Sequence, residues 1–126
     1  MENKKLILVI EDEEPIVRVL TKKLIQEGYE VISARNGQEG INTALKYKPD
    51  IILLDIVMPV LDGVSMLKIL RDDPWGKNVE VIVLTNLTDA AKNAQALTEG
   101  VKDYLIKTDW NLAEVAEKIK QRLAYK

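Results

Sequence analysis

The amino-acid sequence predicts a doubly wound α/β fold, in which helices cover both faces of a parallel sheet. Five short apolar runs recur along the chain, and each is separated from the next by a segment long enough for a helix. The run at residues 51–54 contains no polar residue, which is typical of a strand buried on both faces in a parallel sheet. A length of 126 residues suits one domain. We therefore expect a single domain over 1–126, with no effector domain in this chain.

The apolar runs are the expected strands. They lie at residues 6–10, 31–34, 51–54, 79–84 and 104–106. In sheets of this kind, ligands bind beyond the carboxyl ends of the strands. Side chains that directly follow the runs are therefore the first candidates for a functional site.

Three of the expected helices have clear boundary residues. The first begins near Glu14-Pro15, because proline suits a first helical position, and Gly28 caps its end. The second follows Asn36-Gly37 and the third follows Asp62-Gly63. Their apolar positions at helical spacing are Ile16, Val17, Leu20 and Leu24 in the first helix, Ile41, Ala44 and Leu45 in the second, and Val64, Leu67 and Leu70 in the third. We expect all three to cover the sheet.

The last two expected helices differ in their apolar faces. The fourth, at about residues 88–99, has mostly alanine at its inward positions, with Leu97 as the only large residue. Burial contributes about 25 cal/mol per Å² of apolar surface, so an alanine face should hold this helix weakly and allow it to move. The final helix starts at Asn111, has Glu114 in the capping-box position and runs to about residue 124.

Composition excludes several kinds of site. A formal net charge of −2 does not predict a basic surface, so we expect no direct nucleic-acid partner. The absence of cysteine and histidine removes thiolate chemistry, the usual general base and the commonest metal ligand. No apolar stretch reaches the roughly 18 to 20 residues of a membrane span. We expect a cytoplasmic protein without a membrane partner.

Three acidic residues follow two of the expected strands. Glu11-Asp12 comes directly after the first run, and Asp55 comes directly after the third. Carboxylates 4 Å apart repel by about 4 kcal/mol at an effective dielectric near 20, so we expect a cation among them. Oxygen ligands favour Mg²⁺ or Mn²⁺. The alternative is structural, because acids at strand ends also cap helices and loops.

Two further polar residues end the fourth and fifth runs. Thr85 offers a hydroxyl and Lys107 offers a fixed cation, and both can bind phosphoryl oxygens. An aspartate nucleophile, a divalent metal, a hydroxyl and a lysine together form a plausible phosphoryl-transfer centre. Either residue alone would be unremarkable, since threonine is common in strands and lysine is usually a solvated surface charge. A functional role is supported because Thr85 and Lys107 are both expected at the same edge of the sheet as the acidic residues.

The sequence resembles the response-regulator receiver domain of two-component signalling over almost its whole length. The motifs that carry the resemblance are Glu11-Asp12, Asp55 with Val57-Met58-Pro59 and Asp62-Gly63, Thr85, and Asp103-Tyr104-Leu105-Ile106-Lys107. The resemblance implies a flavodoxin-like, five-stranded sheet of strand order 2-1-3-4-5, as in chemotaxis regulators.

The resemblance also implies the roles of the acidic residues. Asp55 would accept a phosphoryl group from a histidine kinase or a histidine phosphotransfer protein. Asp12, Asp55 and the Val57 carbonyl would bind Mg²⁺, with Glu11 assisting through water, and Mn²⁺ would substitute. Such a protein is a signalling phosphoacceptor that catalyses only its own phosphoryl transfer and slow dephosphorylation, rather than an enzyme.

Three further roles follow from the same resemblance. Lys107 would contact the phosphoryl group, Thr85 would move to bond it, and Tyr104 would change rotamer with that movement. The surface of the fourth helix, fifth strand and fifth helix would then bind a downstream target protein.

The chain departs from the usual receiver pattern at several positions. Thr108 follows Lys107 where receivers usually have proline, and since a cis bond before a non-proline residue costs about 3 kcal/mol, we expect a trans bond there. Asn86 replaces a small residue, and its side chain would either crowd the path to the phosphoryl group or form a hydrogen bond with it. Val57 and Leu87 flank the path of a hydrolytic water and cannot activate it, so we expect slow autodephosphorylation.

Other function classes use similar features. One is a binding module that retains the motif but acts without phosphorylation. A second is a phosphatase of the haloacid-dehalogenase type, which typically needs a second acid two positions after the nucleophile, where this chain has Val57. A third is flavodoxin-like cofactor binding, which the acidic residues 11–14 disfavour at the place where phosphate would bind.

Overall fold

The structure is a computed structural model of the chain. It describes residues 4–55, 60–85, 99–101, 103–106 and 111–124, with only the backbone described for residues 85 and 103–106. None of the helices in these ranges is both long and apolar enough to cross a membrane.

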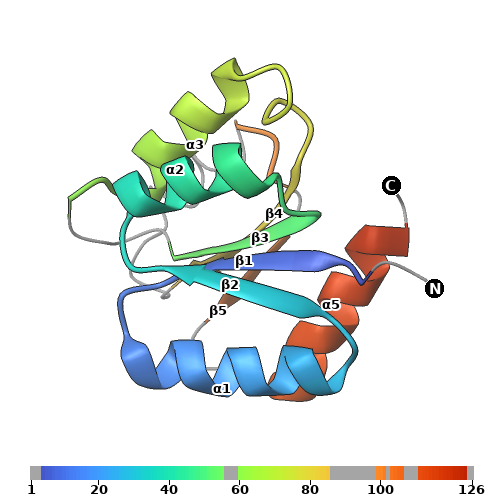
Figure 1. The fold of residues 1–126 in the computed structure, drawn as a ribbon. Coiled ribbons are helices and arrows are strands. Elements are labelled where there is room, and N and C mark those ends of the chain that lie inside the picture. The colour runs from blue at the N-terminus through green and yellow to red at the C-terminus, as the bar shows by residue number, and fades with distance from the viewer. Residues whose placement is uncertain (1–3, 56–59, 86–98, 102, 107–110, 125–126) are drawn as a thin grey trace.

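A five-stranded parallel sheet forms the centre of the molecule (Figure 1). Its strands are β1 (Leu6–Ile10), β2 (Glu30–Ala34), β3 (Ile51–Asp55), β4 (Glu80–Thr85) and β5 (Asp103–Ile106). The strand order is β2-β1-β3-β4-β5 and every neighbouring pair is parallel. The predicted fold class and strand order are therefore confirmed; β1 has the predicted bounds, and the ends of the other strands differ from the apolar runs by at most one residue.

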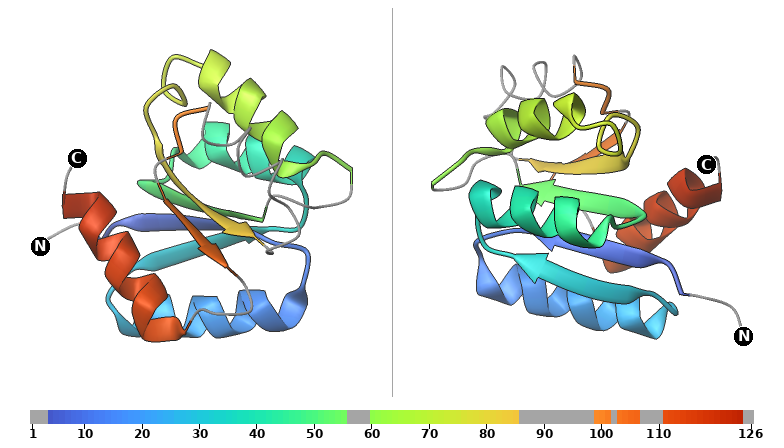
Figure 2. Two further views of the ribbon diagram at one scale, coloured as in Figure 1. Left: turned by 180° about the vertical axis from the view of Figure 1, so that it is seen from behind. Right: turned by 45° about the horizontal axis from the view of Figure 1, so that its top comes forward.

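Helices cover both faces of the sheet. They are α1 (Glu14–Gln26), α2 (Gly37–Tyr47), α3 (Gly63–Asp72) and α5 (Leu112–Ala124). Figures 1 and 2 show α2 and α3 side by side on one face, and α1 and α5 on the other. The predicted fourth helix falls almost entirely on residues 86–98, outside the described part of the chain.

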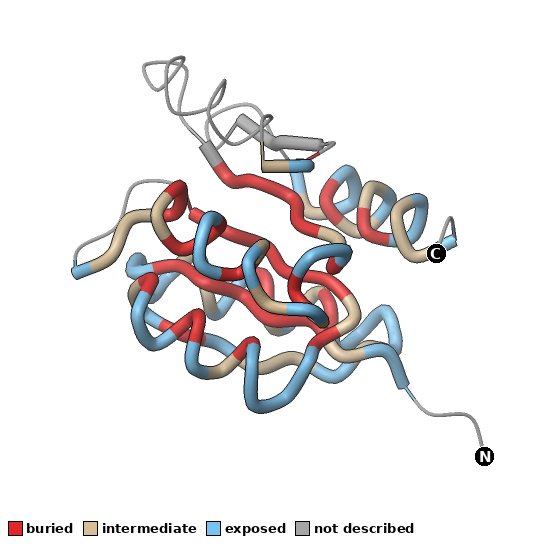
Figure 3. The backbone as a smooth tube through the Cα atoms, turned by 90° about the horizontal axis from the view of Figure 1, so that it is seen from above, coloured by how far each residue is buried: buried red, intermediate tan, exposed pale blue. Residues whose placement is uncertain are grey.

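Each face of the sheet has its own apolar core. Successive residues of a strand point to opposite faces, so Leu8 and Ile10 of β1 join the core under α2 and α3, whereas Ile7 and Val9 join the core under α1 and α5. All of β3 is buried, which explains why the third apolar run is continuous. Figure 3 shows the burial concentrated on β1, β3 and β4 and on the inward faces of the helices, whereas only Ala34 is buried in β2.

The helix boundaries follow the expected local chemistry. After α1, Gly28 has a φ of 96°, and the amide of Tyr29 donates to the Leu24 carbonyl at 3.1 Å, which is a glycine-dependent helix end. The side chains of Asn36, Asp62 and Asn111 each accept a backbone N–H at 2.8 Å and cap α2, α3 and α5 respectively.

The inward face of α2 differs from the prediction at one position. Ile41 and Ala44 are buried as expected, but Leu45 is 37 % exposed. Gly37 and Gly40 complete the buried face of this helix. A Cβ on Gly40 would lie within 3.1 Å of three atoms of Ile10, so the glycine lets the helix approach β1 closely on the buried face that it shares with Ile41 and Ala44.

Candidate functional site

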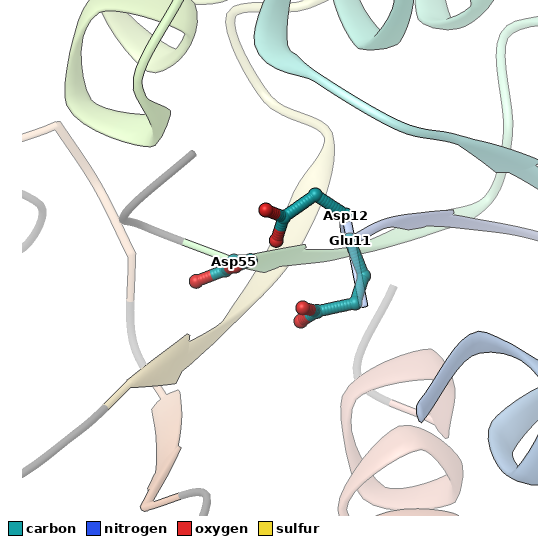
Figure 4. Close-up of side chains that lie close together, drawn as sticks. All are labelled: Glu11, Asp12 and Asp55. Carbon is teal, nitrogen blue, oxygen red and sulfur yellow. The ribbon is translucent and has the colours of Figure 1, made fainter. Parts of the chain in front are cut away.

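Parallel pairing of β1 and β3 brings the predicted acids to one edge of the sheet. Ile10 pairs with Leu54, so Glu11 and Asp12, which follow β1, lie beside Asp55, the last residue of β3. A carboxylate oxygen from each of the three residues lies within 4.8 Å of the other two. Figure 4 shows the three side chains together, with Glu11 and Asp12 leaving the end of β1 in opposite directions.

The three acids differ in burial. Glu11 is 1 % exposed and Asp55 is 3 % exposed, whereas Asp12 is exposed. The backbone fixes Glu11, because its amide donates to the Ala34 carbonyl at 3.0 Å and its Oε1 accepts from the Glu13 amide at 3.2 Å. The site therefore has two buried carboxylates and one carboxylate that faces solvent.

This donor set fits a hard divalent cation. At 4.8 Å, two full negative charges repel by about 3.5 kcal/mol at an effective dielectric near 20, and less where Asp12 is solvated. A cation between the carboxylates would offset that repulsion. Mg²⁺ characteristically uses one or two carboxylates and keeps several waters, which suits a cluster that opens to solvent through Asp12. A buried aspartate beside such an ion is suited to phosphoryl transfer.

The register of β4 and β5 locates two further predicted residues, Thr85 and Tyr104, relative to the acids. Asp55 pairs with Leu84, so Thr85, the last residue of β4, is one strand away from the acids. Thr85 in turn pairs with Ile106, the last residue of β5, and Tyr104 of β5 pairs with Val83. The backbone therefore places Thr85 at the carboxyl edge with Asp55.

Other predicted site residues lie outside the described ranges. These are Val57, Asn86, Leu87, Lys107 and Thr108, together with the Lys107–Thr108 bond.

A turn at residues 60–62 lies between β3 and α3 and has a feature that the sequence does not predict. Val60 has a φ of 71°, in the left-handed region, and its side chain is 78 % exposed. This backbone is unusual for a β-branched residue. The next residue, Leu61, packs against the core under α2 and α3, and Asp62 caps α3. Asp62-Gly63 indicates a turn here, but no local signal predicts the left-handed backbone of Val60, since valine disfavours that conformation.

Comparisons with known proteins agree with the geometry. Residues 7–120 match the family model for the response regulator receiver domain. The response regulator PleD of Caulobacter vibrioides is 41 % identical over 101 residues, which cover 80 % of this chain and 22 % of PleD. The transcriptional regulatory protein KdpE of Mycobacterium tuberculosis is 39 % identical over 102 residues, covering 81 % of this chain and 44 % of KdpE.

Solved structures share the whole fold. A CheY-like response regulator receiver domain protein from Methanospirillum hungatei has a TM-score of 0.90 at 26 % identity, with 98 % of this chain and 96 % of that chain covered. The receiver domain of a Pseudomonas aeruginosa sensor histidine kinase, solved with a magnesium ion coordinated in its active-site cleft, has a TM-score of 0.88 at 29 % identity, with 97 % and 99 % covered.

The family match extends over most of the chain, and the fold and the acidic cluster agree with it. The chain spans less than half the length of the curated relatives that it matches. The chain belongs to the response regulator receiver domain family of two-component systems.

Proposed function

We propose that this chain is a phosphorylation-dependent signalling switch in which Asp55 accepts the phosphoryl group. The observation that carries the proposal is the convergence of Glu11, Asp12 and Asp55 within 4.8 Å at the carboxyl edge of the sheet of a receiver-family protein. The phosphodonor would be a histidine kinase or a histidine phosphotransfer protein. The family match also argues against the haloacid-dehalogenase type of phosphatase.

The chemical step is a displacement at phosphorus. A carboxylate oxygen of Asp55 attacks the phosphoryl group of phosphohistidine, and the phosphorus–nitrogen bond breaks. The electron pair of that bond stays on the imidazole nitrogen, which takes up a proton, and Asp55 becomes an acyl phosphate. Glu11, Asp12 and Asp55, with the carbonyl of Val57, would hold Mg²⁺, which neutralises charge on the phosphoryl oxygens when bound; Mn²⁺ would substitute.

Residues at the ends of β4 and β5 would report the new phosphoryl group. Phosphorylation adds nearly two negative charges at Asp55. Lys107 would pair with that charge, Thr85 would bond a phosphoryl oxygen, and Tyr104 would change rotamer as Thr85 moves. The backbone register, which places Thr85 beside the end of β3, supports this part of the proposal. The fourth helix, β5 and α5 would then form the surface that binds a downstream target protein.

Residues that flank the site would set the lifetime of the phosphorylated form. Val57, Asn86 and Leu87 lack a group that could activate a water molecule as a base, so the acyl phosphate would hydrolyse slowly. In this proposal the chain turns over only its own phosphoryl group, and it acts in the cytoplasm through protein contacts rather than through nucleic acid or membrane. The net charge of −2 is in keeping with protein partners.

The proposal is tested by exposing the chain to acetyl phosphate with Mg²⁺ and recording the intact mass. We expect an adduct of about 80 Da that Asp55→Asn abolishes, because the amide is not a nucleophile for phosphorus. The matched control is Asp62→Asn, a nearby aspartate whose capping role asparagine can fill. That variant should keep the adduct. An unmodified wild-type chain, or an adduct that survives Asp55→Asn, would instead favour a binding module that acts without phosphorylation at Asp55.

A further inference from the structure

A groove of about 430 Å³ lies where α5 meets the end of α1. On the α1 side, Lys23 and Glu27 form an ion pair with Nζ and Oε1 3.1 Å apart, so this wall carries no net charge. The α5 wall includes Ala113, Glu117 and Lys120, and all three are exposed. Figures 1 and 2 show α5 beginning beside α1 and running on past it, so the outer face of α5 is open along its length.

The α5 wall of the groove belongs to a stripe that runs the length of the helix. Ala113, Glu117, Lys120 and Ala124 follow one another at intervals of four, three and four residues, which places them in line on one side of a helix. All four are exposed. We call these four residues the α5 stripe. Its intervals are the same from either end, and its two central residues have opposite charges.

The α5 stripe is complementary to a second copy of itself. When two copies of the helix pack antiparallel, a two-fold axis through the midpoint of the stripe sets Glu117 of each copy opposite Lys120 of the other. The same axis sets Ala113 of each copy opposite Ala124 of the other. Two attractive charge pairs then form at the centre, and the small side chains at both ends allow the helices to approach closely.

The two central charges are available for a partner. In the part of the chain that the structure describes, neither Glu117 nor Lys120 makes an ion pair. Pairing them with a second copy therefore breaks no ion pair within the described residues. A partner helix with charges of one sign would be repelled at either Glu117 or Lys120, whereas an antiparallel copy of the stripe is attracted at both.

We propose that the α5 stripe is a self-association surface, on which a second copy of this chain packs antiparallel about a two-fold axis. The surface is small, because α5 has 13 residues and is about 20 Å long. Its charge pairs are exposed, so the dimer is weak and dissociates further as salt screens them. The inference is independent of the proposed phosphoryl transfer, because the stripe shares no residue with the acidic cluster.

The test uses charge reversals at the two central positions of the stripe. Sedimentation velocity at low salt, over a series of chain concentrations, measures the dissociation constant of the dimer. Glu117→Lys and Lys120→Glu should each weaken the dimer by at least about tenfold, since two repulsive pairs replace two attractive ones. The matched control is Lys68→Glu, which reverses an exposed lysine of α3 and should leave the dissociation constant unchanged.

Mixing the two variants tests the two-fold pairing itself. Glu117→Lys gives a stripe with two positive charges and Lys120→Glu gives one with two negative charges, so a 1:1 mixture should form a heterodimer although each variant alone is monomeric. The double variant, which carries both reversals, restores attraction and should dimerise as the wild type does. Circular dichroism checks that each variant is folded.

Three results would overturn the inference. The first is a wild-type chain that remains monomeric at every concentration. The second is a dimer that both single reversals leave unchanged, because its interface would then lie on another surface. The third is a pair of folded variants that do not associate when mixed, since two-fold pairing of Glu117 with Lys120 requires that they do.

Discussion

The amino ends of the parallel strands form one edge of the sheet, the amino edge, and their carboxyl ends form the other, the carboxyl edge. The two edges differ in how their charged groups are paired. At the amino edge, the Arg71 guanidinium donates from Nε to the Glu99 carbonyl at 2.7 Å and from Nη1 to the Gly76 and Val79 carbonyls, both at 2.8 Å. At the carboxyl edge, Glu11, Asp12 and Asp55 gather three charges of one sign. At the amino edge a cation is therefore paired with backbone carbonyls, whereas at the carboxyl edge three carboxylates repel one another.

This difference separates a structural role from a functional one. Burial lowers the pKa of Arg71, and the charges of Glu80 and Glu99 act in the opposite direction, yet a guanidinium stays protonated at any ordinary pH. Its hydrogen bonds tie the end of α3 to the start of β4 and to the turn before β5. At the carboxyl edge, repulsion among the three acids lowers the stability of the fold but creates a binding site for a cation. Such a loss of stability is common at functional sites.

The largest effect on stability should come from the amino edge. Replacing Arg71 by Met keeps much of the side-chain volume but removes three hydrogen bonds to carbonyls, so we expect the free energy of unfolding to fall by about 3 kcal/mol. Urea unfolding measures this loss. Arg18→Met is the control, because that side chain is 75 % exposed and its ion pair with Glu14 is long, at 3.9 Å. A similar loss of unfolding free energy in both variants would contradict the structural role of Arg71. Loss of the acetyl phosphate adduct in folded Arg71→Met would contradict the separation between a structural amino edge and a functional carboxyl edge.

A smaller effect should come from metal at the carboxyl edge. Mg²⁺ at ten times its dissociation constant should raise the free energy of unfolding by about 1.4 kcal/mol, and removing it with a chelator should reverse the gain. Thermal unfolding with and without MgCl₂ measures both. Asp12→Asn should lose most of the gain because it removes one carboxylate of the cluster, whereas Asp50→Asn, at the amino edge, should keep it. An equal response in the two variants would place the metal elsewhere.

The smallest effect concerns Tyr29, which lies at the amino edge just before β2. Burial, and secondarily the negative charge of Glu27, raise the pKa of Tyr29 above its ordinary value of 10.0. Above pH 10 the unfolded chain releases this proton while the folded chain keeps it, so the free energy of unfolding falls as pH rises through that window. Below pH 10 the contribution is constant.

Tyr29→Phe should therefore reduce the alkaline loss of stability and leave the neutral value nearly unchanged. Urea unfolding at a series of pH values above and below 10 measures the slope, with Tyr47→Phe, an exposed tyrosine of α2, as the comparison. If Tyr29→Phe has the same alkaline slope as the wild type, the hydroxyl of Tyr29 does not couple to folding.

Features that depend on one local pattern could be predicted from the sequence. Continuous apolar runs identify the strands because a strand covered on both faces needs no polar positions. The caps at Asn36, Asp62 and Asn111 follow from side-chain chemistry next to each helix. The grouping of Asp55 with Glu11 and Asp12 follows from parallel pairing, which brings strand ends to one edge.

Features that depend on contacts between distant segments could not be predicted. Leu45 has the right spacing for an inward position, yet it is exposed, and Gly37 and Gly40 complete the buried face of α2 instead. The contact between Gly37 and Leu61 joins two backbones 24 residues apart and leaves no periodic trace in the sequence. The left-handed backbone of Val60 opposes the preference of its own side chain, so only the surrounding packing explains it.

The complete burial of β3 also affects how the strand finds its alignment during folding. In a sheet with one solvent-exposed face, a register shift of one residue exposes apolar side chains to solvent and is therefore unfavourable. A slip of β3 would only exchange side chains between two apolar cores, with Ile52 and Leu54 on one side and Ile51 and Leu53 on the other. Asp55 distinguishes the alignments, because a shift toward the strand interior would carry a carboxylate away from the open edge. The residue proposed to receive the phosphoryl group would thus also select the native pairing of the central strand.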